Sequence, residues 1–170
     1  DARWGATEGL QFGLNVAYLD AEYAEFADAP CTAIQLDANP ACGVAGNAGG
    51  TFNDLSGTPT LYASEYSASL LFDYTYPMSS MDFFVGGEAN YRDEFNSAGD
   101  SDPIDVIPSY TKVNLRIGLR AESWEIMAYG RNIFDEEALT HSFDVPTLAG
   151  SHAYFMDEGA VFGARAKNMF

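Results

Sequence analysis

Two histidines near the end of the chain carry the side chains best suited to metal or acid–base chemistry. His141 and His152 share one long segment with Asp144 and Asp157, and imidazole together with carboxylates can bind a transition metal or an iron chelate. Solvation is the commoner role for loop histidines, so we expect both to be solvated and predict no metal site. Phe143 and Tyr154 in the same segment could stack on a ligand or anchor the loop.

The sequence contains none of the motifs that would indicate catalysis. It has no G-x-S-x-G, no H-E-x-x-H and no glycine loop that would cradle a phosphate. We therefore predict that the chain is not an enzyme and needs no cofactor.

The lysines and arginines form a second chemically interesting set. All eight fall in segments that alternate polar and apolar residues, and all but Arg3 are assigned to the polar phase. They could steer an anionic substrate, or pair with acidic residues of the same phase, and we favour pairing. The basic residues of this phase are Arg92, Lys112, Arg116, Arg120, Arg131, Arg165 and Lys167. Their acidic counterparts are Asp73, Asp82, Glu88 and Glu125.

The two cysteines, Cys31 and Cys42, lie close together in a stretch rich in Gly, Ala, Asn and Pro. Two thiols without nearby His or further Cys cannot fill a tetrahedral metal site. In an oxidising compartment such a pair forms a local disulfide, which we predict here.

Period-two alternation of apolar residues predicts β-strands rather than helices. It recurs in six segments, and residues 1–5 read as the end of a seventh strand. Each segment has about the length that a tilted, membrane-spanning strand needs. The six predicted strands are residues 10–18, 66–76, 82–92, 112–120, 124–131 and 162–170.

The connections between these strands alternate between short and long. Tight turns are expected near residues 6–9, 77–80 and 121–123, and long loops over residues 27–61, 93–108 and 135–158. The long loops are rich in Gly, Asn, Asp and Pro, so we expect little regular structure in them. Outer-membrane barrels show this asymmetry between short periplasmic turns and long external loops.

These patterns favour an all-β membrane β-barrel, an antiparallel up-and-down meander, with its polar row facing inward. Aromatic residues near the predicted strand ends would form the girdles at the two bilayer interfaces. The alternative is a soluble, secreted β-sandwich that binds carbohydrate, with its apolar faces packed together. A net charge of -17 argues against nucleic acid as a partner. No apolar run is long enough for a membrane helix, and no signal peptide is visible.

The second half of the chain resembles the end of a TonB-dependent outer-membrane receptor. Residues 110–118 resemble the antepenultimate barrel strand of that family, and residues 124–138, with Asn132-Ile133-Phe134-Asp135, resemble the penultimate strand and its exit. The final strand contains Phe162 and ends in Phe170, which resembles the signal read by the barrel-assembly machinery. The first half fits the family more loosely.

The resemblance implies a 22-stranded barrel of which residues 1–170 are the C-terminal part. Because about eight strands is the smallest workable barrel, the earlier strands and a plug domain are expected outside this chain. The implied function is energy-coupled uptake of a large, scarce solute such as a ferric siderophore, cobalamin or an oligosaccharide. A passive porin or a structural barrel is the alternative within the membrane class.

The same resemblance implies the surroundings of the chain. Its location would be the bacterial outer membrane, in contact with lipid and lipopolysaccharide. Its partners would be the remaining strands, the plug, the nutrient ligand and, through a segment outside this chain, the inner-membrane TonB complex. The basic residues of the polar phase could then also pair with acidic groups of the plug.

Overall fold

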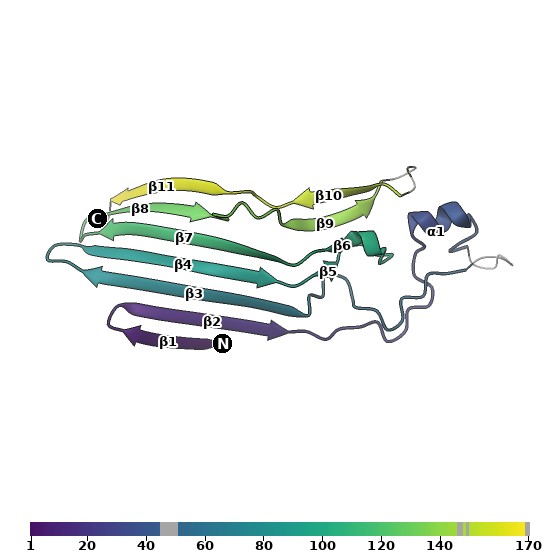
Figure 1. Cartoon of the computed structure of the whole chain (residues 1–170), viewed down its shortest axis with the longest axis horizontal. Helices are drawn as coiled ribbons and strands as arrows, with labels where there is room; N and C mark the ends of the chain where they lie inside the picture. The colour runs from purple at the N-terminus through teal and green to yellow at the C-terminus, as the bar shows by residue number, and fades with distance from the viewer. Residues whose placement is uncertain (45–50, 146–147, 149, 169–170) are drawn as a thin grey trace.

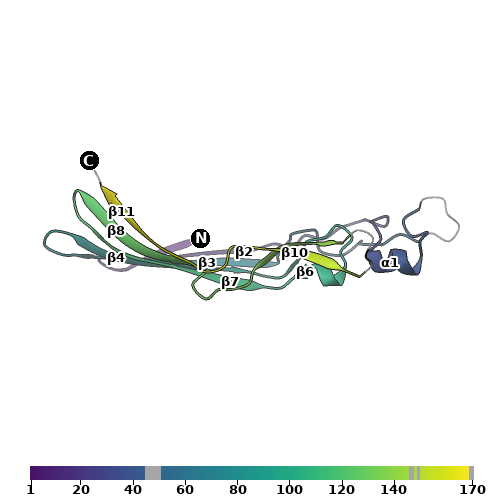
Figure 2. The same ribbon diagram turned by 90° about the horizontal axis from the view of Figure 1, so that it is seen from above.

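The chain folds into a long sheet that continues at one end into its loops. The computed structural model describes residues 1–44, 51–145, 148 and 150–168. The strands lie side by side along the long axis, and all three long connections leave the sheet at the same end (Figure 1). We call this end of the strands the loop end. The opposite end of the strands, which carries the short turns, is the turn end. Seen from above, the loops extend the sheet rather than covering it (Figure 2).

The main sheet contains seven antiparallel strands, and each pairs with the next one along it. This confirms the six predicted strands, the seventh at the start and the up-and-down order. Its edges are β1 and β11, so the described strands form an open sheet. In spatial order the strands are β1 (Ala2–Thr7), β2 (Leu10–Tyr18), β3 (Tyr66–Pro77), β4 (Asp82–Arg92), β7 (Tyr110–Arg120), β8 (Trp124–Arg131) and β11 (Val161–Asn168).

The register sorts side chains onto two chemically different faces, because paired residues in a sheet point to the same side. Arg116 is paired with Gly86 and Tyr129, whereas the next residue, Ile117, is paired with Val85 and Ala128. We call the face that carries Arg116 the charged face and the face that carries Ile117 the apolar face.

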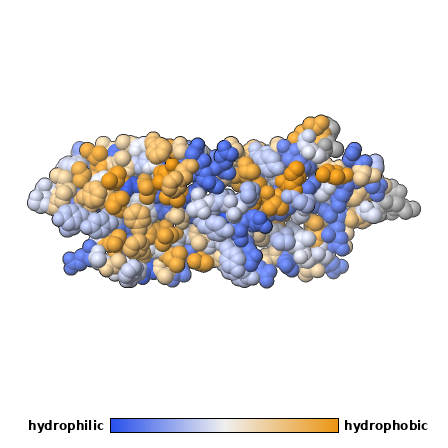
Figure 3. All heavy atoms as spheres, in the orientation of Figure 1, coloured by the Kyte–Doolittle hydropathy of each residue, from blue (hydrophilic) through white to orange (hydrophobic). Residues whose placement is uncertain are grey.

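The apolar face is exposed. Every large hydrophobic side chain that is exposed in the described strands of the main sheet lies on it, and hydrophobic residues gather over the sheet in the space-filling view (Figure 3). A soluble sandwich would bury such a face beneath a second sheet. The exposed side chains are Trp4, Leu14, Val16, Tyr18, Tyr66, Leu70, Tyr76, Tyr91, Leu115, Ile117, Ile126 and Phe162.

Most of the buried hydrophobic core lies in the loops rather than in the sheet. Leu55, Phe95, Ile107 and Ala138 are buried there, whereas Phe84 is the single buried hydrophobic residue in the described strands of the main sheet. The sheet therefore has little buried hydrophobic core of its own, and most of the packed core belongs to the loops.

The long loops contain regular structure, so the expectation of little regular structure in them was wrong. They hold a helix, a 3-10 turn and two small two-stranded sheets at the loop end (Figure 1). These elements are α1 (Ala33–Ala38), β5 (Phe95–Asn96), η1 (Pro103–Asp105), β6 (Val106–Ile107), β9 (Leu139–Asp144) and β10 (His152–Met156).

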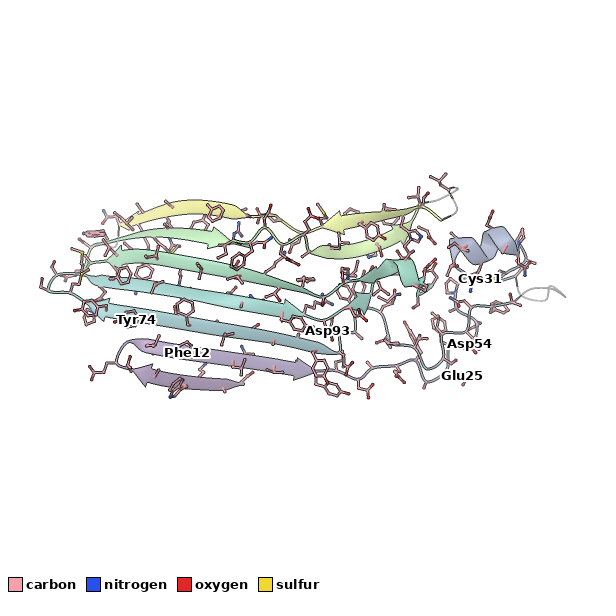
Figure 4. The ribbon with its side chains drawn as sticks, viewed as in Figure 1. Phe12, Glu25, Cys31, Asp54, Tyr74 and Asp93 are labelled. Carbon is pink, nitrogen blue, oxygen red and sulfur yellow. A yellow bond between two sulfur atoms is a disulfide. The ribbon has the colours of Figure 1, made fainter. Side chains whose placement is uncertain are left out.

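The helix α1 forms for a local reason. The Thr32 hydroxyl accepts a hydrogen bond from the Gln35 backbone N–H at 3.2 Å, and the Gln35 side chain accepts one from the Thr32 N–H at 2.9 Å. This reciprocal capping box stabilises a helix start. The predicted disulfide joins Cys31 to Cys42 on either side of the helix, far from the sheet (Figure 4). No helix among the described residues has the length and apolar character needed to cross a membrane.

Candidate functional site

All the charged residues that the sequence assigned to the polar phase lie on the charged face. The register pairs Lys112 with Asn90, Arg120 with Glu125 and Lys167 with Glu125, and places the remaining members on the same side. The face therefore carries a mixed field of positive and negative groups, as the alternation predicted. Its charged members include Asp73, Glu88, Arg92, Lys112, Arg116, Arg120, Glu125, Arg131, Arg165 and Lys167.

Glu125 is the centre of the ion-pair network at the turn end. Its two carboxylate oxygens accept hydrogen bonds from Arg120 Nε and from Arg165, both at 2.8 Å, and its side chain is only 8% exposed. Two of the seven basic residues are thus held by one acid from β8. Pairing of this kind within the face is what the sequence analysis favoured, whereas Asp82 and Glu88 form no ion pair with a lysine or arginine among the described residues.

A second pair crosses the middle of the sheet. Arg116 on β7 reaches over β4 to form an ion pair with Asp73 on β3. The residue between them in the register is Gly86, and a Cβ there would lie 2.9 Å from Arg116 Nε. The missing side chain at Gly86 therefore leaves room for this contact. Glu88 accepts hydrogen bonds from Asn114 at 2.7 Å and Asn90 at 3.1 Å.

Basic residues near the loop end tie the sheet to its loops. Lys112 pairs with Asp157, and this hydrogen bond holds the pKa of the Asp157 carboxyl below its ordinary value. Arg131 pairs with Glu158 at 3.2 Å. Arg92 donates to the Ser64 hydroxyl and the Tyr62 carbonyl.

Phe84 is packed on the charged face between a glycine and an arginine. It is paired with Gly118, and the Arg120 guanidinium lies 5.0 Å from its ring centroid. A Cβ at Gly118 would meet the Phe84 ring, with Cε1 at 2.9 Å, and the Ile126 carbonyl. A side chain at Gly118 therefore has no space unless both the Phe84 ring and the backbone at Ile126 move.

We predict that Gly118→Val destabilises the folded protein by about 1–3 kcal/mol, the usual cost of overpacking. Gly5 on the same face is the matched control, because a Cβ there meets nothing within 4 Å in the part of the protein that the structure describes. Gly5→Val should leave stability unchanged or raise it slightly, since Val suits a strand. Urea unfolding of the complete protein in lipid would measure both, and equal losses would contradict the packing described.

Aromatic side chains at the loop end surround His141, one of the predicted histidines. We call His141, Tyr62, Phe143 and Phe155 the aromatic group. His141 lies against Tyr62, Phe143 and Phe155, with ring centroids about 6 Å apart, and its Nδ1 is 2.6 Å from the Tyr62 hydroxyl. Tyr62 also contacts Phe95. The predicted candidates His141 and Phe143 are therefore brought together, and the sequence analysis had not linked Tyr62 to them.

The side chain of His152 is only 2% exposed, so the expectation that it is solvated was wrong. The β9–β10 pairing places Asp144 opposite His152 and Ser142 opposite Tyr154, on the other side of the ribbon from the aromatic group. His152 Nδ1 lies 3.1 Å from Asp105 Oδ1. The Tyr154 hydroxyl donates to the Ile104 carbonyl at 3.0 Å. Both predicted candidates on β10 therefore contact η1 residues.

Asp144 and His152 lie on this side of the two-stranded β9–β10 ribbon. Together with Asp100, Asp102 and Asp105 they form a group that we call the buried acidic cluster. Ser97 and Ser142 connect its segments through a hydroxyl contact of 2.6 Å. Burial raises the pKa of the Asp100 carboxyl, and the negative charges of Asp144 and Asp105 act in the same direction. The sequence analysis missed Asp102 and Asp105, whose proximity to β10 depends on how the loops fold back.

Of the two residues predicted to form the barrel-assembly signal, one lies within the described part of the chain and the other does not. Phe162 lies on β11, exposed on the apolar face. Phe170 lies outside the described residues, so its role as an assembly signal stays a prediction.

Comparison with known proteins gives one informative structural likeness. No family model matches the sequence, and no curated protein matches it. The structure is similar to the siderophore receptor PiuA from Acinetobacter baumannii, with a TM-score of 0.66 and 18% sequence identity. The similarity covers 98% of this chain and 20% of the receptor, so the chain spans about a fifth of that protein's length. At this identity the likeness shows that the chain shares the fold of the matching part of that protein.

Proposed function

We propose that this chain is the C-terminal part of the barrel wall of a TonB-dependent outer-membrane receptor. The observation that carries the proposal is the two-sidedness of the sheet. One face presents exposed hydrophobic side chains, and the other presents ion pairs such as Arg116 with Asp73. A sheet with this arrangement suits hydrocarbon on one side and a wet interior on the other.

The dimensions of the apolar face support a bilayer environment. Tyr66 and Tyr76 lie on this face near opposite ends of β3, and ten residues of strand span about 33 Å. At the tilt usual for outer-membrane barrels, this length corresponds to an apolar band about 25 Å tall. Tyr18 and Tyr91 lie near Tyr66 at the loop end, as an interfacial girdle would.

The proposed transport follows from the positions of the two regions. The charged face would line the interior. Its charged side chains that lack a partner within the face would form ion pairs with a plug domain. The loop end would face outward, in contact with lipopolysaccharide, and its aromatic group would contribute to capturing the solute. Energy from the TonB complex would act on the plug, outside this chain. The structural similarity to a siderophore receptor favours a ferric siderophore over cobalamin or an oligosaccharide.

Solute uptake by cells with and without the complete gene tests this function. We expect deletion to reduce uptake of one iron-loaded siderophore from a panel to near background, and the complementing gene to restore it. Removing TonB should have the same effect as removing the receptor. Uptake that persists without TonB, together with open-channel conductance in planar bilayers, would instead identify a passive porin.

A further inference from the structure

The buried acidic cluster at the loop end has more negative than positive groups. Asp102 and Asp105 are buried, and the His152 side chain is only 2% exposed. Asp144 is more open, with 28% of its side chain exposed. Three separate segments supply these residues: the turn around η1, strand β9 and strand β10.

Several polar atoms of the cluster have no hydrogen-bond partner although they are buried. They are Asp102 Oδ2, Asp105 Oδ2, Asp144 Oδ1 and His152 Nε2. Asp102 uses its other oxygen to accept a hydrogen bond from the Ile104 N–H at 3.1 Å. Asp105 Oδ1 and Asp144 Oδ1 lie 3.1 Å and 3.5 Å from His152 Nδ1, whereas Nε2 has no partner. Native proteins rarely leave such groups unsatisfied, because each costs about 1–3 kcal/mol.

The basic residues of the chain do not balance these charges. Throughout the described ranges, no lysine or arginine forms an ion pair with Asp100, Asp102, Asp105 or Asp144. Carboxylates that share a buried site repel one another unless a cation compensates them. Among the described residues, His152 is the one basic side chain in contact with them.

We propose that Asp102, Asp144 and His152 bind one divalent transition-metal cation. Their ligand atoms lie within 4.8 Å of one another, so small side-chain movements would bring them around one ion. A site with one imidazole and two carboxylates suits Zn²⁺ or a similar metal, whereas Ca²⁺ prefers oxygen ligands alone. Asp105 is a positioning residue, because a carboxylate on the second ring nitrogen orients a ligating histidine.

The bound cation would act as a structural crosslink of the outer loops. It would join the turn around η1 to the β9–β10 ribbon, whose opposite side carries the aromatic group. Its role does not depend on which solute is transported. It is a resident ion rather than the transported cargo, because its ligands are largely buried.

Zn²⁺ titration of the purified, chelator-treated complete protein tests this site by calorimetry. We expect one equivalent to bind, and His152→Gln and Asp144→Asn each to weaken binding at least about 10-fold, since even indirect partners of a metal can matter that much. His141→Gln, which alters the nearby histidine outside the cluster, is the matched control and should bind as the native protein does. Heat-dependent electrophoretic mobility would verify that each variant is folded; Asp144 is the more exposed position and keeps the test available if His152→Gln does not fold.

Two results would overturn the metal site. One is unchanged Zn²⁺ binding in folded Asp144→Asn. The other is Ca²⁺ binding in place of Zn²⁺ with equal affinity in the native protein and folded His152→Gln. Because binding is measured on purified protein, these outcomes are separate from the uptake assay: uptake can fail while Zn²⁺ binds, and the reverse.

Discussion

Leu14→Arg is expected to destabilise the complete protein in lipid by about 2–4 kcal/mol, the cost of an arginine facing lipid near the bilayer midplane. Leu14 is exposed on the apolar face and paired with Leu70, midway between the aromatic residues at the two ends of the sheet. The arginine would have to leave water for hydrocarbon or distort the bilayer to remain hydrated. Equilibrium unfolding in urea from lipid vesicles would measure the loss.

The neighbouring residue provides the control for Leu14→Arg. Asn15 is exposed on the charged face, one residue further along the same strand, so Asn15→Arg places an identical group on the wet side. We expect its effect on the free energy of unfolding to stay within about 0.5 kcal/mol. Equal losses in the two variants would show that the faces do not differ in environment.

Asn132→Ala is expected to destabilise the protein by about 2–4 kcal/mol, since buried partners lose their hydrogen bonds. Asn132 is 3% exposed and follows β8. Its amide donates to the Glu136 and Glu158 carbonyls and accepts from the Glu136 N–H. Its backbone N–H donates to Asn114 Oδ1 at 2.8 Å. One side chain therefore anchors both ends of the last loop to the sheet.

Asn132→Gly separates the side chain from the backbone contribution. Asn132 has a φ of 47°, a left-handed conformation that asparagine tolerates and alanine does not. The glycine variant loses the same side-chain hydrogen bonds but adopts the positive φ without steric cost. Its free energy of unfolding should therefore exceed that of Asn132→Ala by about 1 kcal/mol. The same unfolding experiment compares the two, and an alanine variant as stable as native would contradict the anchoring role.

The sheet and its two faces could be predicted because period-two alternation is a local property of each strand. Val113, Leu115 and Ile117 identify one face of β7 without any knowledge of its neighbours. The Asn132-Ile133-Phe134-Asp135 motif was also recognisable, and the structure supplies a physical reason for it: Asn132 and Asp135 both have positive φ, and both side chains bond across the loop.

The loop structure could be predicted only where its cause was local. Thr32 and Gln35 are spaced as a capping box, so α1 was within reach of the sequence. The acidic cluster was not, because Asp102 and His152 meet only after the β9–β10 ribbon packs beside η1. Their separation in the sequence carries no signal of this contact. The β9–β10 pairing was not predicted, because the composition of this segment is typical of an irregular loop.

Spin labels placed one at a time along β7 test the two-sidedness of the sheet most directly. The two cysteines of this chain are joined in a disulfide, so single introduced cysteines can be labelled in the complete protein in lipid once any free cysteine outside this chain has been replaced. We expect labels at Val113, Leu115, Ile117 and Leu119 to be accessible to oxygen dissolved in hydrocarbon. Labels at Lys112, Asn114, Arg116 and Arg120 should instead respond to a water-soluble nickel complex. Uniform accessibility along the strand, or the opposite alternation, would contradict the proposed barrel wall.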